Sequence, residues 1–322
     1  MKKFLMLILA GTLLLTACVL SYQIFLDTDR QAVADSLQTK KKRKQPPKPT
    51  WIDNGSNVVV YLVPHQDDEV LTFSVPILND IRGGKKVYLV LMSDGRGTFA
   101  RTVLNGKFDQ KNPHKKAKPF YCRLHKRYHD PQKEHYLHGW LTIEDVAEIR
   151  LREFYHAAEA LGIPSNQVRL NMIEHFTYDT VRQVILQEVK NFPNAVFKSM
   201  SPIDSHKEHA MCGIVLNDLL REGKVKQAET HFASIFTDRF SHKKFPGYKM
   251  RLTHQEDAAK VRKALKAYMT WNPEHGEYAI GYHSVPSQFI SMERRIYTKI
   301  IQEKRPTEQE PVKKQVATVK AE

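Results

Sequence analysis

The stretch "NVVVYLVPHQDDEVL", residues 57–71, decides the fold class, because a short apolar segment runs directly into a polar cluster. Residues 58–63 are apolar and rich in β-branched side chains, as expected of a buried strand in a parallel sheet. One histidine and three acids follow at once, within residues 65–69. Acids this close together repel one another near a core unless a cation joins them. The stretch therefore predicts a strand whose carboxyl end carries a cation site.

Further strands and helices alternate along the chain, which indicates an α/β fold: a Rossmann-like, mostly parallel β-sheet flanked by helices. In such sheets, functional sites form beyond the carboxyl ends of the strands. Pro76 is expected to kink the first helix. The pattern predicts strands at 57–63, 86–92, 194–200 and 231–237, and helices at 69–82, 143–163, 181–191 and 206–222.

An interval of about 45 residues, 98–142, separates the second strand from the long helix and is too long for an ordinary connection. It is basic, aromatic and rich in histidine. We interpret it as an insertion, at about 99–140, near the active site. It is either a lid that binds substrate or a decorated surface loop.

A second polar cluster, "SPIDSHKEHAMCG" at 201–213, also follows an apolar strand, and places His206 and His209 one helical turn apart. If the two strands are neighbours, His65, Asp68 and His209 form a set of two imidazoles and one carboxylate. Three protein ligands with an open fourth position are typical of a catalytic zinc ion.

The remaining polar residues of the two clusters then acquire catalytic roles. Asp67 is the spare carboxylate beside the ion, placed to act as general base. His206 is placed to stabilise a developing oxyanion or to protonate the leaving amine.

With these motifs the chain resembles the zinc-dependent de-N-acetylases, which include the LmbE-like proteins and the N-acetylglucosaminyl-phosphatidylinositol (PIG-L) deacetylases. "PHQDDE" is similar to the first motif of that family, (A/P)HPDDE, and "DSHKEH" to its D-x-H-P-D-H motif. "SDGRGT", "AEIRLREFYHAAEALG" and the region around "KALKAYMTWNPEHGEYAIGYHSVPSQF" resemble three further motifs, in family order. Gln66 and Lys207 replace prolines, and Glu208 replaces the aspartate beside His206.

The resemblance implies one zinc ion, or another divalent ion, held by His65, Asp68 and His209. It implies Asp67 as general base and His206 as the group that polarises the acetyl carbonyl. For substrate binding we expect three residues: Arg150, Arg96 and Asp204. The alternative for Arg150 is a surface ion pair with Glu153 at i, i+3.

The first residues, "MKKFLMLILAGTLLLTACVL", have the layout of a secretory signal, and residues 15–18 resemble a bacterial lipobox. We expect cleavage before Cys18, which would carry a lipid and anchor the protein to the outer face of the membrane. An uncleaved signal anchor is the alternative, because about 20 apolar residues span a bilayer. Either way, the body lies outside the cytoplasm.

We divide the chain into a signal at 1–18, a tether at 19–50, a catalytic domain at 51–303 and a disordered tail at 304–322. The tether includes "KKKRKQPPKPT" and is either a spacer or a basic arm attracted to anionic lipid or polymer. Much of the net charge of +15 lies in short segments such as this tether and is not spread over the predicted domain, so we expect no nucleic-acid partner. Cys122 and Cys212 either form a disulfide or remain free thiols.

The sequence thus predicts a zinc-dependent hydrolase that removes acetyl groups from N-acetylglucosamine-type sugars of a cell-surface or extracellular glycan. Alternatives are a deacetylase of a membrane glycolipid and a carbohydrate-binding lipoprotein without catalysis. A metal phosphoesterase would need a second metal and its ligands. Only the histidines of the insertion are available for that, and their spacing matches no motif that we know.

Overall fold

The computed structural model describes residues 57–106, 118–136 and 139–301. These residues fall within the predicted catalytic domain. The predicted signal with Cys18, the basic tether and the C-terminal tail lie outside the described residues. Within the described part of the chain, no helix is both long and apolar enough to cross a bilayer.

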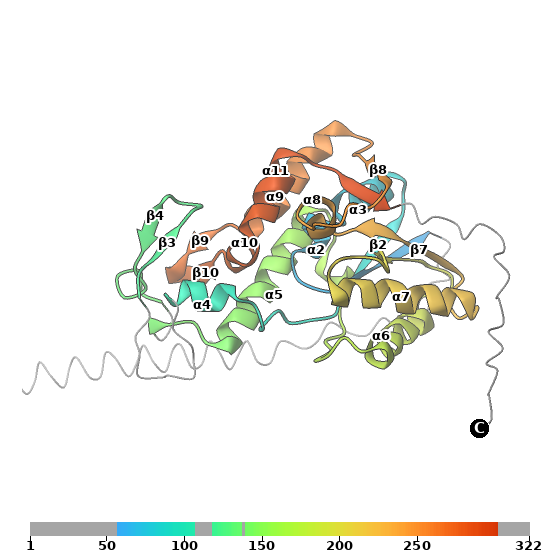
Figure 1. Ribbon diagram of the computed structural model, residues 1–322, viewed down its shortest axis with the longest axis horizontal. Helices are drawn as coiled ribbons and strands as arrows, with labels where there is room; N and C mark the ends of the chain where they lie inside the picture. Colours follow the sequence, from blue (N-terminus) through green and yellow to red (C-terminus); the bar gives the residue numbers. More distant parts are fainter. Residues whose placement is uncertain (1–56, 107–117, 137–138, 302–322) are drawn as a thin grey trace, which may run out of the picture. The chain divides into compact units, whose positions relative to one another are not determined.

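A seven-stranded sheet forms the centre of the fold, in the order β5-β2-β1-β6-β7-β11-β8 (Figure 1). The first five of these strands are parallel, and β11 is antiparallel to both of its neighbours. The predicted α/β fold with a mostly parallel sheet is therefore confirmed. The strands are β1 (Val58–Val63), β2 (Lys86–Leu91), β5 (Val168–Leu170), β6 (Val196–Met200), β7 (Gln227–Ala233), β8 (Gly247–Met250) and β11 (Thr298–Ile301).

Strand β1 is buried on both faces, because its side chains alternate between two hydrophobic cores. Tyr61 and Val63 enter one core, whereas Val60 and Leu62 enter the other. This continuous burial explains why the strand reads as an unbroken apolar run.

Helices cover both faces of the sheet. The first core is closed by α2 (Asp68–Leu71), α3 (Ser74–Arg82), α5 (Ile143–Ala160), α9 (Ala258–Ala267), α10 (Ile280–Ser284) and α11 (Pro286–Arg294). The second is closed by α6 (Tyr178–Asn191) and α7 (Lys207–Arg221). Short 3-10 helices lie at Ser165–Gln167, Gln255–Asp257 and Pro273–His275.

The predicted kinked helix at 69–82 is in fact two helices, α2 and α3, separated at Thr72 and Phe73. Pro76 lies in the first turn of α3, where a backbone N–H has no intrahelical partner to lose. The chain thus breaks before the proline instead of bending at it.

The long helix α5 confirms the prediction for 143–163 and begins with a capping box. The Thr142 side chain accepts from the Asp145 N–H at 3.0 Å, and the Asp145 carboxylate accepts from the Thr142 N–H at 2.8 Å. The helix is followed by Gly162 at φ +91°, a left-handed conformation that favours glycine. These local signals fix the position of α5 beside the site.

The strand predicted at 231–237 is wrong in its second half, because β7 ends at Ala233 and α8 (Ile235–Arg239) follows. The Ser234 side chain accepts from the Thr237 N–H at 3.2 Å and so caps the new helix. A capping serine inside an apolar run was the signal against a continuous strand.

The described part of the insertion forms α4 (Ala100–Leu104) and a hairpin of β3 (Phe120–Cys122) and β4 (Arg127–His129). In Figure 1 the hairpin lies beside α10 and the short strands β9 (Trp271–Asn272) and β10 (Glu277–Tyr278). A small third core joins these elements, and Phe120, Tyr136 and Tyr278 lie in it. The insertion is therefore docked on the C-terminal part of the domain.

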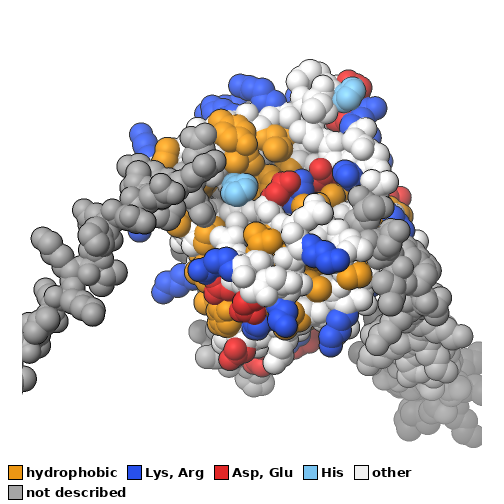
Figure 2. All heavy atoms as spheres, turned by 90° about the vertical axis from the view of Figure 1, so that its right-hand side faces the viewer, with side chains coloured by type: hydrophobic (Ala, Val, Ile, Leu, Met, Phe, Trp, Pro, Cys, Tyr) orange, Lys and Arg blue, Asp and Glu red, His pale blue; other side chains and the backbone are white. Residues whose placement is uncertain are grey.

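On the side of the molecule that Figure 2 draws, the described residues form no continuous basic patch. Lys and Arg side chains are interspersed there with acidic and uncharged ones. The two cysteines of the described part, Cys122 and Cys212, are buried free thiols, so the disulfide alternative is wrong. Burial raises the pKa of Cys212, whose Sγ lies 3.9 Å from Met92 Sδ.

Candidate metal centre

The two polar clusters meet because their strands are neighbours in the sheet. β1 and β6 pair in parallel, with Val59 opposite Val196. Their carboxyl ends therefore open at the same edge, and the loop after β1 faces the loop that leads into α7. The prediction that the two strands are neighbours is therefore confirmed.

Three side-chain atoms from these loops converge on one point. His65 Nδ1 lies 3.1 Å from His209 Nε2, and each of them lies 3.3 Å from Asp68 Oδ2. Zinc bound by nitrogen and oxygen at about 2.0–2.2 Å holds such ligand atoms about 3.3–3.5 Å apart in a tetrahedron. The donor types and spacing of His65, Asp68 and His209 therefore fit one divalent ion.

Carboxylates behind the two histidines orient their rings. Glu208 Oε2 lies 2.5 Å from His65 Nε2, on the side away from Asp68. Asp204 Oδ1 lies 3.3 Å from His209 Nδ1. Such outer partners fix the imidazole so that its other nitrogen faces the ion.

The position of Asp204 suits the orientation of His209 better than contact with substrate. Asp204 is buried, accepts from the N–H and hydroxyl of Ser234, and does not line the cleft described below. It also accepts from the backbone N–H of His206 at 2.9 Å. Asp204 therefore contacts both the His209 ring and the backbone of His206 at the N-cap of α7.

The charges of the ligand set stabilise one another. Burial raises the pKa of Asp68, but His209 and His65 outweigh burial and hold it well below the usual range. Burial lowers the pKa of His209, but the Asp68 charge and the Asp204 contact raise it to about 10. Two carboxylates, those of Asp68 and Asp204, thus lie against the two nitrogens of the His209 ring.

Asp67 lies beside the ligands in a backbone conformation that is rare for an aspartate, with φ 100° and ψ −26°. Its N–H donates to Glu69 Oε2 and to the Tyr268 hydroxyl, both at 3.0 Å. Tyr268 in turn donates to Glu69 Oε1 at 2.6 Å. Glu69 is fully buried, so it serves as the anchor that holds the strained turn.

The three acids of the opening stretch therefore do different work. Asp68 faces the two histidines, Glu69 holds the turn, and Asp67 is free of both tasks. Burial raises the pKa of Asp67 to about 6, although Arg150 lowers it. This value suits a general base near neutral pH.

Arg150 lies on α5 and is only 3% exposed, which rules out the surface ion pair with Glu153. Its Nη2 donates to Asp67 Oδ2 at 3.1 Å and to the carbonyl of Gln66, and its Nη1 donates to Ser284 Oγ at 2.9 Å. Glu153 instead accepts from the N–H groups of Ile280 and Gly281 in α10. Arg150 thus links Asp67 to Ser284 at the end of α10.

The segment at 93–98 passes over Gln66 and Arg150. Gly95 has φ +66°, and a Cβ there would lie 2.5 Å from Gln66 Oε1 and 2.6 Å from Arg150 Nε. Only glycine allows this approach. Arg96 lies at the rim, where its Nε donates to Asp94 Oδ2 at 2.5 Å.

A cleft of about 950 Å³ opens above the ligands. His206, at the N-cap of α7, lines it within 4.8 Å of the other two histidines, so its ring also could approach an ion. Arg96 and Arg150, both expected to bind substrate, line the cleft as well. Their substrate-binding role stays a prediction.

The sequence analysis missed part of the cleft. Met172, Phe176 and Phe236 line it, and Met172 and Phe236 are exposed. The Phe176 ring lies 5.6 Å from the His65 ring, centre to centre. Met172 and Phe176, apolar side chains in the otherwise polar loop after β5, were a signal that could have found part of this wall, whereas Phe236 lies on α8.

The described part of the insertion does not form a lid over the cleft, so the choice between a lid and a surface loop stays open for the insertion as a whole. None of its described residues, within 99–106, 118–136 and 139–140, lines the cleft. Its contact with the site is indirect and runs through α10, whose last residue, Ser284, does line the cleft.

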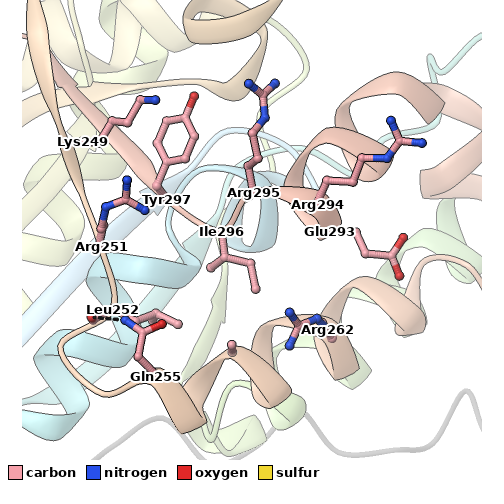
Figure 3. A pocket seen from close by; sticks show the side chains of 11 residues that line it. Lys249, Arg251, Leu252, Gln255, Arg262, Glu293, Arg294, Arg295, Ile296 and Tyr297 are labelled. Atoms are coloured by element: carbon pink, nitrogen blue, oxygen red, sulfur yellow. Dashed lines mark hydrogen bonds between the residues drawn. The ribbon is translucent and has the colours of Figure 1, made fainter.

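A second hollow, of about 320 Å³, lies between β8, α9 and the segment that joins α11 to β11 (Figure 3). Lys249, Arg251 and Arg262 line it together with Arg294 and Arg295, and Glu293 is its acidic residue. It shares no residue with the cleft and offers no histidine or cysteine. It is not a candidate for the metal centre.

Comparison with known proteins agrees with the motifs. Residues 60–219 match the sequence model of the PIG-L family, GlcNAc-PI de-N-acetylase. This segment runs from β1 to the end of α7 and contains all three proposed ligands. No curated protein sequence matches the chain significantly.

Several solved structures are similar to the chain at low identity. The A40926 pseudoaglycone deacetylase Dbv21 is 14% identical, with a TM-score of 0.49 over 76% of this chain and 97% of that one. The N,N'-diacetylchitobiose deacetylase of Pyrococcus horikoshii is 16% identical, with a TM-score of 0.43 over 76% and 83%. A mutant teicoplanin-pathway deacetylase is 12% identical, with a TM-score of 0.48 over 77% and 99%.

Proposed function

The chain belongs, through residues 60–219, to the family of GlcNAc-PI de-N-acetylases, and we propose that it hydrolyses the acetamide of N-acetylglucosamine-type sugars in a glycan outside the cell, using zinc. The family makes it an N-deacetylase, an amide hydrolase that acts on N-acetylated sugars. The observation that carries the proposal is the triangle of His65, Asp68 and His209 beside the carboxylate of Asp67, which Arg150 holds outside the triangle.

His65, Asp68 and His209 would hold the ion at the floor of the cleft. A divalent ion bound there supplies Lewis acidity and makes a water molecule a stronger acid. The protein keeps the three donor atoms in place through Glu208 and Asp204, so that little reorganisation is needed on binding.

Asp67 takes the proton of the attacking water. Its carboxylate is fixed on one side by Arg150, and its backbone is fixed by Glu69 and Tyr268. A base held in this way is oriented before substrate arrives, which lowers the entropic cost of the step. After attack, the protonated Asp67 can return the proton to the departing amine nitrogen.

His206 lines the cleft from the N-cap of α7, with its ring centre 4.4 Å from that of His209. Its backbone N–H is bound to Asp204 at 2.9 Å, which holds the residue at the helix start. An imidazole N–H at this place can donate to the acetyl oxygen as negative charge develops on it.

The shape of the cleft supports a sugar as substrate. Phe176, Met172 and Phe236 provide apolar surface, whereas Asp94, Arg96 and Glu174 provide polar contacts. Sugar rings have apolar faces and polar edges, and binding sites commonly combine these two kinds of lining. The open cleft leaves room for a residue within a longer glycan.

The cellular location is part of the proposal. The support for it is the signal-like start of the sequence, with Cys18 as the proposed lipid-anchored residue and the catalytic domain on the outer side of the membrane. A glycan of the cell surface is then the substrate within reach of a tethered enzyme.

The test is release of acetate by the purified full chain from N-acetylated wall polysaccharides, chitooligosaccharides and an N-acetylglucosaminyl lipid. We expect release from at least one glycan, with loss of about 10²–10⁴ in kcat for Asp67→Asn. Asp179→Asn, an exposed carboxylate on α6 away from the cleft, is the matched control and should retain full activity. Release from the lipid alone would replace the glycan by a membrane substrate, and full activity of Asp67→Asn would reject the proposed base.

A further inference from the structure

The histidine-rich insertion folds into a second cluster of metal-ligating side chains. Cys122 ends β3, His125 lies in the turn and His129 ends β4. Cys122 Sγ lies 3.5 Å from His125 Nδ1, which lies 2.9 Å from His129 Nε2. The three donor atoms all lie within 4.8 Å of one another. A hairpin thus gathers one thiol and two imidazoles.

A fourth donor comes from a distant part of the chain. His283 lies on α10, and its Nε2 is 3.3 Å from Cys122 Sγ. Ligand atoms around a tetrahedral zinc, with bonds of about 2.0–2.3 Å, lie about 3.3–3.7 Å apart. The Cys122–His125 and Cys122–His283 separations lie in that range, and the His125–His129 separation of 2.9 Å is shorter. His283 lies outside the group of three whose donor atoms are all within 4.8 Å of one another, so its ring must move closer to the other two imidazoles to complete a tetrahedron. Cys122 and His129 are fully buried, and His283 is nearly so.

The Nδ1 atoms of His283 and His129 already have partners, which leaves Nε2 of His283 beside the thiol and Nε2 of His129 beside His125. His283 Nδ1 donates to the carbonyl of Ala279 at 2.7 Å. His129 Nδ1 lies 2.8 Å from Glu134 Oε2, and Trp271 Nε1 donates to the same oxygen at 2.9 Å. A carboxylate or carbonyl behind a ligating histidine is the usual outer contact of a metal site.

From this geometry we propose that Cys122, His125, His129 and His283 bind a structural zinc ion, separate from the catalytic centre. The spacing of His125 and His129 matches no complete motif by itself, but a separation of four residues is also found between the histidine ligands of structural zinc sites. Thiolate and imidazole together select zinc over hard cations such as Mg²⁺ or Ca²⁺. With four protein donors the site has no open position, so it has no catalytic role.

The ion fastens the insertion to the wall of the active site. The hairpin and α4 belong to a small hydrophobic core that a metal ion can supplement. His283 directly precedes Ser284, whose hydroxyl accepts from Arg150 and lies 2.6 Å from Thr98 Oγ1. The site therefore holds α10, and through it Ser284, in position. The proposal does not depend on the reaction that the enzyme catalyses.

Cobalt distinguishes the two centres, because only this one contains a thiolate. The full chain is stripped of metal and titrated with Co²⁺, and the sulfur-to-cobalt charge-transfer band in the near ultraviolet is recorded. We expect the band in the wild-type protein and in His209→Ala, which lacks only a ligand of the first centre. Cys122→Ser should abolish the band, whereas Cys212→Ser and Cys18→Ser should retain it.

Because Cys122→Ser could lose the band by misfolding, a second variant is made at His125, which is exposed. We expect His125→Ala to fold, to bind Co²⁺ at this site at least tenfold more weakly, and to release zinc to a chelator faster than the control His156→Ala, an exposed histidine on α5. Absence of the band in folded wild-type protein saturated with Co²⁺ would overturn the proposal. A band that survives in Cys122→Ser would do the same.

Discussion

Arg150 Nη2 lies 3.1 Å from Asp67 Oδ2, and this contact joins the predicted base to helix α5. The same guanidinium binds the Gln66 carbonyl and the Ser284 hydroxyl. A planar, bidentate group is needed to reach all three, and a lysine cannot replace it. Arg150 is therefore a positioning residue for Asp67, whether or not it also contacts substrate.

We predict that Arg150→Lys lowers kcat by about 10²-fold, because a displacement of the base by about 1 Å is enough for such a loss. KM should change much less, since the charge is kept. Steady-state kinetics with acetate release as the readout would measure both. Arg152→Lys, on the same helix, is the control, and a KM effect without a kcat effect would instead assign Arg150 to substrate binding.

Asp204 is the outer partner of His209, and its loss should weaken the metal centre. We predict that Asp204→Asn lowers the affinity for zinc by about 10–100-fold while the protein stays folded. Competition with a chromophoric chelator gives the affinity. An unchanged affinity with a raised KM would mean that Asp204 serves the substrate, as the sequence analysis expected.

Substitution of Gly95 tests whether this position needs glycine for steric reasons or only for loop flexibility. Gly95→Ala must place a Cβ at φ +66° and against Gln66 and Arg150, so we expect a loss of about 1–2 kcal/mol or more in the free energy of unfolding and reduced activity. Gly97→Ala is the matched control, because no atom lies within 4 Å of its added Cβ. Denaturant unfolding of both variants checks this, and equal effects would refute the steric explanation.

The pH dependence of stability should reveal the link between α3 and α9. The hydrogen bond from Arg82, at 2.7 Å, and the nearby Lys260 hold the pKa of Asp257 below its usual 3.8. Asp257 therefore stabilises the fold above about pH 4, and this contribution is lost as the pH falls through the lowered pKa. Asp257→Asn should lower Tm at pH 7 but little near pH 3, and a constant difference across this range would argue against the ion pair.

Much of the fold and of the candidate site could be predicted from short sequence patterns. The apolar run of β1 and the ligands behind it were visible in the sequence, because strand burial and ligand type are properties of short segments. That His65 and His209 meet, 144 residues apart, depended on β1 and β6 being neighbours. The motif resemblance supported this arrangement before the structure described it.

Contacts between distant segments could not be read in the same way. The environment of Arg150 is set by Ser284, and the role of the insertion is set by His283, both far along the chain from their partners. The sequence spacing of Cys122, His125 and His129 does not indicate which residue would be the fourth ligand. Only the packing of α10 against the hairpin brings His283 to the thiol.

The central claim is that His65, Asp68 and His209 hold the ion on which deacetylation depends. The most direct measurement is an anomalous difference map, recorded above and below the zinc edge, from crystals of the active full chain. We predict a peak about 2.0–2.2 Å from His65 Nδ1, Asp68 Oδ2 and His209 Nε2, and its loss together with acetate release in His209→Ala. Active crystals without a peak at that point, or a His209→Ala variant with full activity, would contradict the claim.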